Sequence, residues 1–244
     1  MNGAGMETLI FDCDGVLVDS EVIAEATLLQ QLGQLLPDIP EDVALRQALG
    51  MTTGAILERL ERQSAHRLPA DALERIDGAI EARLAKELRA VEGVADTLAG
   101  IELPVAIVSN SRRRRVLASL AVTGLDARLG EVPLFTADEV ERPKPAPDLY
   151  LLAARRMGRA PADCLVVEDS VSGVTAAHAA GMTVIGFTGA SHIEEGHVAR
   201  LLEAGAWRVL PAMHGLESLI QLWRERRRAG AKAATNETNE ETPR

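Results

Sequence analysis

Two acidic residues follow a short apolar run near the start of the chain, at a spacing that suits acid–base chemistry. The run Thr8–Phe11 predicts a buried strand, and it stops at a polar turn in which Asp12 and Asp14 precede Gly15. A carboxylate can attack phosphorus as a nucleophile, and a neighbouring acid can protonate the leaving oxygen and later activate water. The pair therefore favours phosphoryl transfer, with Asp12 as the nucleophile and Asp14 as the acid and base.

Further polar residues lie where later strands of the same sheet are predicted to end. They are Ser109 and Asn110 after one strand, Lys144 in a loop before a helix, and Glu168 and Asp169 after another strand. Ligands of open α/β sheets bind beyond the carboxyl ends of the strands, so these side chains are expected to meet in one crevice. Arginine outnumbers lysine 23 to 3 in this chain, which indicates that a compact ammonium is needed at position 144.

Several carboxylates can be buried together only when a cation neutralises them, and a set of oxygen ligands suits Mg²⁺. We therefore predict a Mg²⁺ site formed by Asp12, Asp14, Glu168 and Asp169. The transferring phosphoryl group also needs cations and hydrogen-bond donors around its oxygens. The residues predicted to bind phosphate or substrate are Ser109, Asn110, Lys144, Gly15 and Glu21.

Two kinds of secondary-structure pattern surround these residues in the sequence. From about Val91 the pattern alternates between helix and strand, as in a parallel sheet covered on both faces. Between Glu21 and Ala90, leucine and isoleucine recur at helical spacing and no strand is predicted. The fold class is therefore α/β, a doubly wound parallel sheet with an inserted all-helical cap. The domains are residues 1–19 and 91–228 for the core, 20–90 for the cap and 229–244 for a disordered tail, which has no Val, Ile, Leu or aromatic residue.

Composition excludes several kinds of partner. The formal net charge is −10 and aromatic residues make up 2 % of the chain, so neither a basic footprint nor stacking platforms for nucleic acid are present. The apolar runs are too short to span a membrane. No hydrophobic leader precedes the first strand and the two cysteines are far apart, so we expect a cytoplasmic protein with reduced thiols. We expect a small phosphorylated molecule as its substrate, with no nucleic-acid or membrane partner, and a monomer by default.

The motifs resemble those of the haloacid dehalogenase-like phosphohydrolases, in the subgroup with a small helical cap that includes β-phosphoglucomutase and sugar-phosphate phosphatases. The resemblance rests on four motifs in the family's order: Asp12-Cys13-Asp14-Gly15-Val16-Leu17 with Asp19-Ser20-Glu21, Ser109-Asn110, Lys144-Pro145-Ala146-Pro147-Asp148, and Glu168-Asp169-Ser170 with Gly173. It implies that Asp12 is the nucleophile and a metal ligand, that Asp14 gives a backbone carbonyl to Mg²⁺, and that Glu168 and Asp169 complete the metal site. It further implies that Ser109 holds the phosphoryl group and that Lys144 pairs with its charge.

Two other functions remain as alternatives. A phosphosugar mutase of the β-phosphoglucomutase type needs its cap to hold a distal phosphate, but the histidine and arginine of the mutase cap fall at Ala24 and Thr53 here. A binding protein that has kept the fold is disfavoured by the intact set of reactive residues. The resemblance and the residues together predict a Mg²⁺-dependent phosphatase. It would hydrolyse a sugar, polyol or sugar-acid phosphate through an aspartyl-phosphate intermediate on the enzyme.

Some conspicuous residues have structural interpretations. Cys13 lies between the two acids and is expected to point into the core. Arg112 to Arg115 are expected to form a solvated helix face, with Arg112 the one most able to reach a substrate. His192 and His197 are not spaced as two ligands on one helix face, so zinc binding is disfavoured.

Overall fold

The computed structural model describes residues 6–40, 43–44 and 53–240, the last ten of these by their backbone alone. The parts of the predicted core, cap and tail that fall on residues 1–5, 41–42, 45–52 and 241–244 lie outside the described residues. The centre of the fold is a parallel sheet, which confirms the predicted α/β class. Its six strands are, in spatial order, β3 (Leu134–Thr136), β2 (Val105–Ser109), β1 (Thr8–Phe11), β4 (Cys164–Glu168), β5 (Thr183–Phe187) and β6 (Arg208–Leu210).

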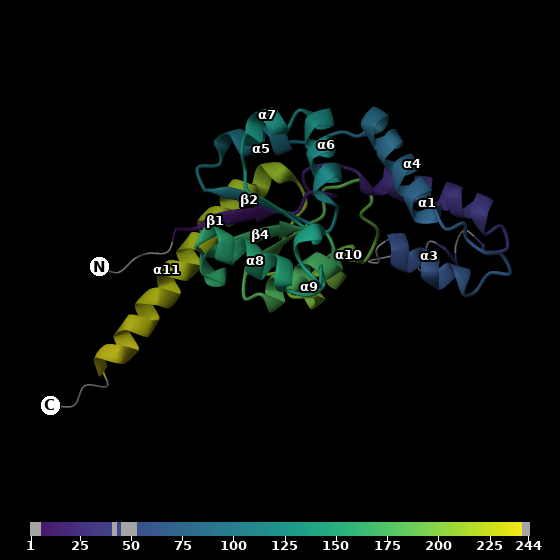
Figure 1. The fold of residues 1–244 in the computed structure, drawn as a ribbon. Helices are drawn as coiled ribbons and strands as arrows, with labels where there is room; N and C mark the ends of the chain where they lie inside the picture. Colours follow the sequence, from purple (N-terminus) through teal and green to yellow (C-terminus); the bar gives the residue numbers. More distant parts are fainter. Residues whose placement is uncertain (1–5, 41–42, 45–52, 241–244) are drawn as a thin grey trace.

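The central strand β1 packs against both layers because its side chains alternate between the two faces of the sheet. Leu9 and Phe11 belong to one apolar cluster and Ile10 to the other, and all three are fully buried or nearly so. Figure 1 shows helices on both faces of the sheet. They are α5 (Val94–Gly100), α6 (Arg113–Thr123), α7 (Asp126–Leu129), α8 (Asp148–Met157), α9 (Val171–Ala179), α10 (His197–Glu203) and α11 (Leu216–Glu240).

Within the chain between β1 and β2, the helices of residues 20–90 stand to one side of the sheet (Figure 1). These are α1 (Glu21–Leu35), α3 (Thr53–Glu61) and α4 (Ala72–Glu87), and the described residues of this stretch contain no strand. Their buried side chains repeat at helical spacing, for example Ile76, Ile80 and Leu84 on α4. Two backbone hydrogen bonds join the segments that enter and leave the insertion, from Asp19 N to Arg89 O and from Val91 N to Leu17 O, each at 3.0 Å.

Two predicted elements differ from the structure. The alternation of helix and strand predicts a helix over 193–202, but α10 begins only at His197, because Gly196 adopts a left-handed φ of 79° that interrupts a right-handed helix. The tail expected to be disordered from residue 229 instead continues α11 as far as Glu240. Four alanines between 229 and 234 favour a helical backbone there through their high intrinsic helix propensity. None of the helices among the described residues has the length and apolar character to cross a membrane.

Candidate active site

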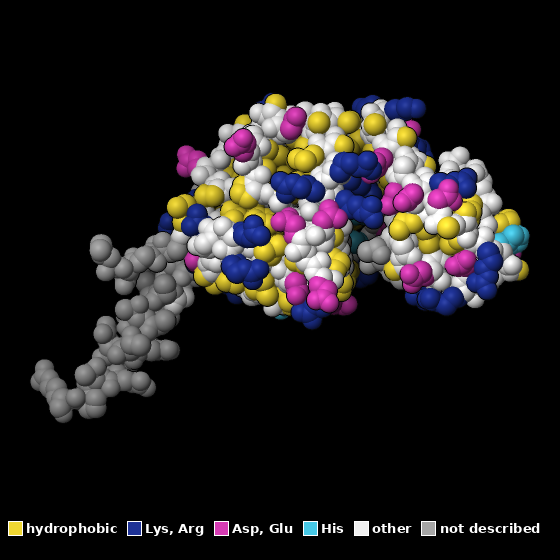
Figure 2. Space-filling view, viewed as in Figure 1, with side chains coloured by type: hydrophobic (Ala, Val, Ile, Leu, Met, Phe, Trp, Pro, Cys, Tyr) yellow, Lys and Arg dark blue, Asp and Glu magenta, His cyan; other side chains and the backbone are white. Residues whose placement is uncertain are grey.

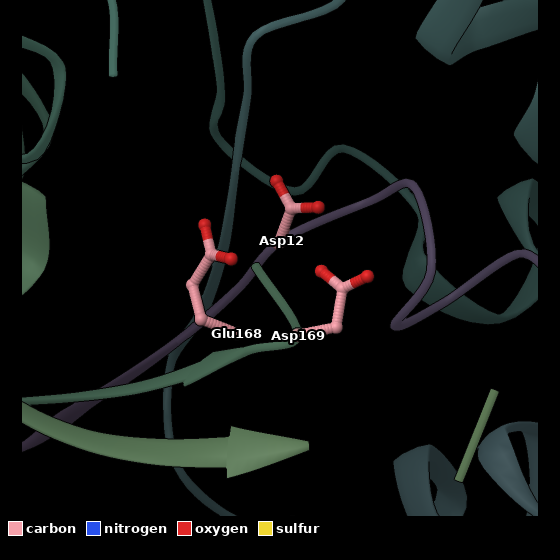
Figure 3. Close-up of side chains that lie close together, drawn as sticks. All are labelled: Asp12, Glu168 and Asp169. Atoms are coloured by element: carbon pink, nitrogen blue, oxygen red, sulfur yellow. The ribbon is translucent and has the colours of Figure 1, made fainter. Parts of the chain in front are cut away.

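Three buried carboxylates converge beyond the ends of two neighbouring strands. Asp12 follows β1, and Glu168 and Asp169 stand at the end of β4, which pairs directly with β1. One carboxylate oxygen from each residue lies within 4.8 Å of the others, and Figure 3 shows the three side chains pointing into a common space. Asp12 is 7 % exposed, Glu168 fully buried and Asp169 3 % exposed. The parallel register of β1 and β4 therefore brings together residues more than 150 positions apart in the sequence.

The Lys144 ammonium lies between two of these carboxylates, those of Asp12 and Glu168. It donates to Asp12 Oδ1 at 2.6 Å, to Glu168 Oε1 at 2.5 Å and to the carbonyl of Val108 at 3.0 Å. Burial by itself would lower the pKa of Lys144, but Asp12 and Glu168 raise that pKa well above its ordinary value. Lys144 is thus held as a cation, in the place and with the charge that its motif predicts.

Glu168 is held from several directions. The Tyr150 hydroxyl, on α8, donates to Glu168 Oε1 at 2.8 Å, and the Ser170 hydroxyl donates to Oε2 at 3.0 Å. The Ser170 hydroxyl also accepts from Gly173 N at 3.0 Å as the N-cap of α9. A Cβ at Gly173 would overlap the Glu168 carboxylate, so a glycine is needed at that position.

Asn110 contacts the main chain of Lys144. Its side-chain amide donates one hydrogen bond to the Lys144 carbonyl and accepts one from the Lys144 N–H, both at 3.0 Å. The side chain therefore fixes the loop that presents the lysine.

Asp14 is surrounded by hydroxyl groups. Ser20 donates to Oδ1 at 2.7 Å, Ser111 donates to Oδ2 at 2.7 Å, and Ser109 approaches Oδ2 at 3.3 Å. Burial would raise the pKa of Asp14, but the Arg115 guanidinium, 3.8 Å from Oδ1, and these hydroxyls together lower it below its ordinary value. Asp14 is therefore ionised in this state and lies beside Ser109, as predicted.

Gly15 and Glu21 flank the acidic group on the side of the insertion. Gly15 has a φ of 77°, and a Cβ there would overlap the Asp169 carboxylate. Glu21 begins α1, and burial followed by the charges of Asp14 and Asp169 raises its pKa to about 7. Gly15 thus packs against Asp169, the charges of Asp14 and Asp169 act on Glu21, and their roles in binding substrate stay predictions.

The charges of the site fit a divalent cation. Burial, and then the neighbouring charges of Glu168 and Asp169, raise the pKa of Asp12 well above its ordinary value in spite of Lys144. Burial also raises the pKa of Asp169. Three buried carboxylates with a single lysine among them leave negative charge uncompensated, and oxygen-only ligands match the preference of Mg²⁺. Asp12, Glu168 and Asp169 could hold such an ion.

The structure also places Cys13 and the run of arginines from Arg112 to Arg115. Cys13 is fully buried, as predicted, and burial raises the pKa of its thiol well above the ordinary value. The arginine that reaches the site is Arg115, whereas Arg112 is exposed at the start of α6. Figure 2 shows Lys and Arg side chains gathered where α6 and α4 approach each other, and there Arg114 Nη2 lies 2.7 Å from Glu81 Oε2. The expectation that Arg112 is the arginine most able to reach a substrate stays a prediction.

Other contributing residues were not singled out as such from the sequence. Ser20 belongs to the first predicted motif and Ser111 directly follows the second, so their position in the sequence was an available signal. Tyr150 and His192 lie far from their partners in the sequence, and only the tertiary fold brings them to Glu168 and Asp169.

Comparisons with known proteins agree with this geometry. The family model described as haloacid dehalogenase-like hydrolase matches residues 9–187. The chain is 34 % identical over 193 residues to 6-phosphogluconate phosphatase of Escherichia coli, covering 77 % of this chain and 85 % of that protein. It is 35 % identical over 184 residues to fructose-1-phosphate phosphatase of the same organism, covering 72 % and 94 %.

A solved structure shares most of the fold. A haloacid dehalogenase-like protein of unknown function from Agrobacterium tumefaciens superimposes with a TM-score of 0.78 at 37 % identity, covering 89 % of this chain and 99 % of that chain. The family model, the two relatives and the shared fold confirm the resemblance carried by the four motifs. The chain belongs to the haloacid dehalogenase-like hydrolase family.

Proposed function

We propose that this protein is a Mg²⁺-dependent phosphatase that hydrolyses a small phosphorylated metabolite through an aspartyl-phosphate on Asp12. The observation that carries the proposal is the meeting of Asp12 with Lys144, Glu168 and Asp169 at the carboxyl ends of β1 and β4, with Asp14 and Ser109 close by. In this proposal residues 1–19 and 91–228 form the catalytic core. The helices within 20–90 form a cap beside the site.

In the first step Asp12 attacks phosphorus, and the bond between phosphorus and the substrate oxygen breaks. Asp14, which takes up a proton from solvent when substrate binds, gives that proton to the leaving oxygen. In the structure Ser109 lies 3.3 Å from Asp14, and its hydroxyl is needed for the incoming phosphoryl oxygens. When Ser109 turns to the substrate, Asp14 loses a hydrogen bond and gains an anionic neighbour, and both changes increase its affinity for a proton.

In the second step Asp14 removes a proton from water, and that water attacks phosphorus and releases Asp12. The hydroxyls of Ser20 and Ser111, with Arg115 nearby, favour the ionised Asp14 that this step needs. Lys144 keeps its positive charge beside Asp12 and the phosphoryl oxygens throughout. A bound Mg²⁺ supplies further positive charge to the phosphoryl oxygens.

The substrate is a sugar, polyol or sugar-acid phosphate. Two relatives named for 6-phosphogluconate and fructose 1-phosphate support this class. Residues 20–90 contain no Phe, Tyr or Trp, so the cap offers no aromatic ring for stacking on a nucleobase or aryl group. Glu21 is a cap residue whose pKa is raised by burial and by the charges of Asp14 and Asp169, so its carboxyl lies close enough to the site to form hydrogen bonds with substrate hydroxyls.

A panel of phosphate esters tests the proposal. Purified protein is incubated with 6-phosphogluconate, fructose 1-phosphate, a hexitol phosphate, β-glucose 1-phosphate and a nucleotide, each with Mg²⁺ or with EDTA. Released phosphate is measured, and glucose 6-phosphate is measured for the glucose ester. We expect release from at least one sugar or polyol phosphate, with Mg²⁺ only. Absence of release from every ester with Mg²⁺ would overturn the proposal, and conversion of β-glucose 1-phosphate to glucose 6-phosphate without phosphate release would identify the mutase alternative.

A further inference from the structure

Two histidines close to each other in the sequence hold the same acidic residue. His192 Nε2 lies 3.0 Å from Asp169 Oδ2, and His197 Nε2 lies 2.6 Å from the main-chain carbonyl oxygen of Asp169. One imidazole therefore contacts the side chain of Asp169 and the other contacts its backbone. The two rings stand nearly perpendicular, with centroids 6.2 Å apart.

The neighbours of the rings show which nitrogens donate. Arg200 Nη2, which has only hydrogens to offer, lies 3.0 Å from His197 Nδ1, so Nδ1 accepts and Nε2 carries the proton given to the Asp169 carbonyl. His192 Nδ1 is buried and has no partner among the described residues, so the hydrogen bond of this ring is the one that Nε2 donates to Asp169. Each histidine thus acts on Asp169 as a donor.

The loop that carries His192 is itself fixed. Ser191 donates twice to Asp19 Oδ1, from its N–H at 3.2 Å and from its hydroxyl at 2.8 Å. A Cβ at Gly15 would lie 3.0 Å from His192 Cε1 and would overlap the Asp169 carboxylate, so the turn after Asp14 packs closely on both residues. His192 is therefore held against Asp169 by the segment that contains the reactive acids.

We propose that His192 and His197 are positioning residues for Asp169, which direct its carboxylate into the metal site. His192 holds Oδ2, so Oδ1 is the oxygen presented to a divalent cation, while His197 fixes the backbone from which the side chain projects. Hydrogen bonds of this kind to ligating carboxylates orient them and raise metal affinity. The inference rests on the proposed function in one respect, namely that Asp169 is a ligand of Mg²⁺.

Binding of Mg²⁺ alone, measured by titration calorimetry without substrate, tests this role. His192→Met keeps a side chain of similar length without an N–H donor, and His192→Gln restores a donor near the position of Nε2. We expect His192→Met to weaken Mg²⁺ binding about 10- to 100-fold, the range seen when such supporting residues are removed. We expect His192→Gln to recover most of the affinity and His197→Gln to bind better than His197→Met.

His178→Ala is the matched control, because that histidine is exposed on α9 and outside the site. We expect it to bind Mg²⁺ like the unmodified protein. Thermal unfolding in EDTA shows whether each variant is folded, and a variant that is folded but binds weakly supports a positioning role. Equal Mg²⁺ affinity for His192→Met, His192→Gln and the unmodified protein would overturn the inference. Mg²⁺ binding by the unmodified protein without any phosphatase activity would instead contradict the proposed function and leave this inference standing.

Discussion

The side-chain amide of Asn110 spans the peptide groups on both sides of the Lys144 Cα, accepting from Lys144 N and donating to Lys144 O at 3.0 Å each. Asn110, directly after the end of β2, thus fixes the backbone position of Lys144 in a loop distant in sequence. Because the lysine ammonium contacts both Asp12 and Glu168, the geometry of the acidic group depends on this pair of hydrogen bonds.

We expect Asn110→Ala to lower kcat about tenfold while KM changes little, because Lys144 is displaced from the phosphoryl oxygens by a fraction of an ångström. Loss of two partly buried hydrogen bonds is expected to reduce the free energy of unfolding by about 1–2 kcal/mol. Steady-state kinetics and urea unfolding measure both effects. A rise in KM with unchanged kcat would show that the amide binds substrate directly, contrary to this assignment.

Lys144→Arg tests the need for a compact ammonium. Lys144 is 6 % exposed and surrounded by Asp12, Glu168 and Tyr150, which leaves no room for a planar guanidinium. We expect kcat to fall about 100-fold or more, the scale found when a preorganised donor to a developing anion is lost. Lys86→Arg, on the exposed side of α4, is the matched control and is expected to keep full activity. Comparable activity of Lys144→Arg and Lys86→Arg would contradict this role for Lys144.

Glu21 gives a prediction about stability and pH. Its pKa in the folded protein is about 7, against an ordinary value of 4.5, so between these pH values the folded chain binds a proton that the unfolded chain has released. The contribution of Glu21 to the free energy of unfolding therefore becomes more unfavourable as pH rises from 4.5 to about 7. It does not change further above that range. The charged groups that act on this carboxyl are Asp14, Asp169, His192 and Arg115.

We accordingly expect Glu21→Gln to raise the melting temperature in EDTA at about pH 8, and to change it much less at about pH 4, because the amide cannot ionise. Differential scanning calorimetry at the two pH values measures the effect. An equal change in melting temperature at both values would show that Glu21 has an ordinary pKa.

The strands and the reactive motifs were predictable because they depend on local pattern. Buried strands appear as short apolar runs, and polar residues directly after them fall at the sheet edge by topology alone, as Asp12 and Asp169 do. Contacts between distant segments have no such local signal. Tyr150 is the single tyrosine of the chain and lies within an apolar helix pattern, so nothing in its surroundings indicates the hydrogen bond to Glu168.

The same limit applies to the loop after β5. Its apolar residues suggested a helix from Ile193, whereas the left-handed Gly196 delays the helix to His197 and leaves His192 in a loop that reaches Asp169. Arg115 was missed for a related reason. The run of four arginines looks uniform in sequence, and only the rotation of α6 against the insertion decides which of them faces Asp14.

The variant Asp12→Asn tests the role of Asp12 as the nucleophile. The amide keeps the volume of the side chain but is not nucleophilic, so the fold is retained and covalent catalysis is lost. The measurement is phosphate release by Asp12→Asn with Mg²⁺ on the best ester of the panel, together with acid quenching and mass spectrometry of the unmodified enzyme to locate a phosphoryl group. We expect no turnover by Asp12→Asn and a phosphoryl group on the peptide containing Asp12. Mg²⁺-dependent turnover retained by Asp12→Asn would show that Asp12 is not the nucleophile and would indicate direct attack by water.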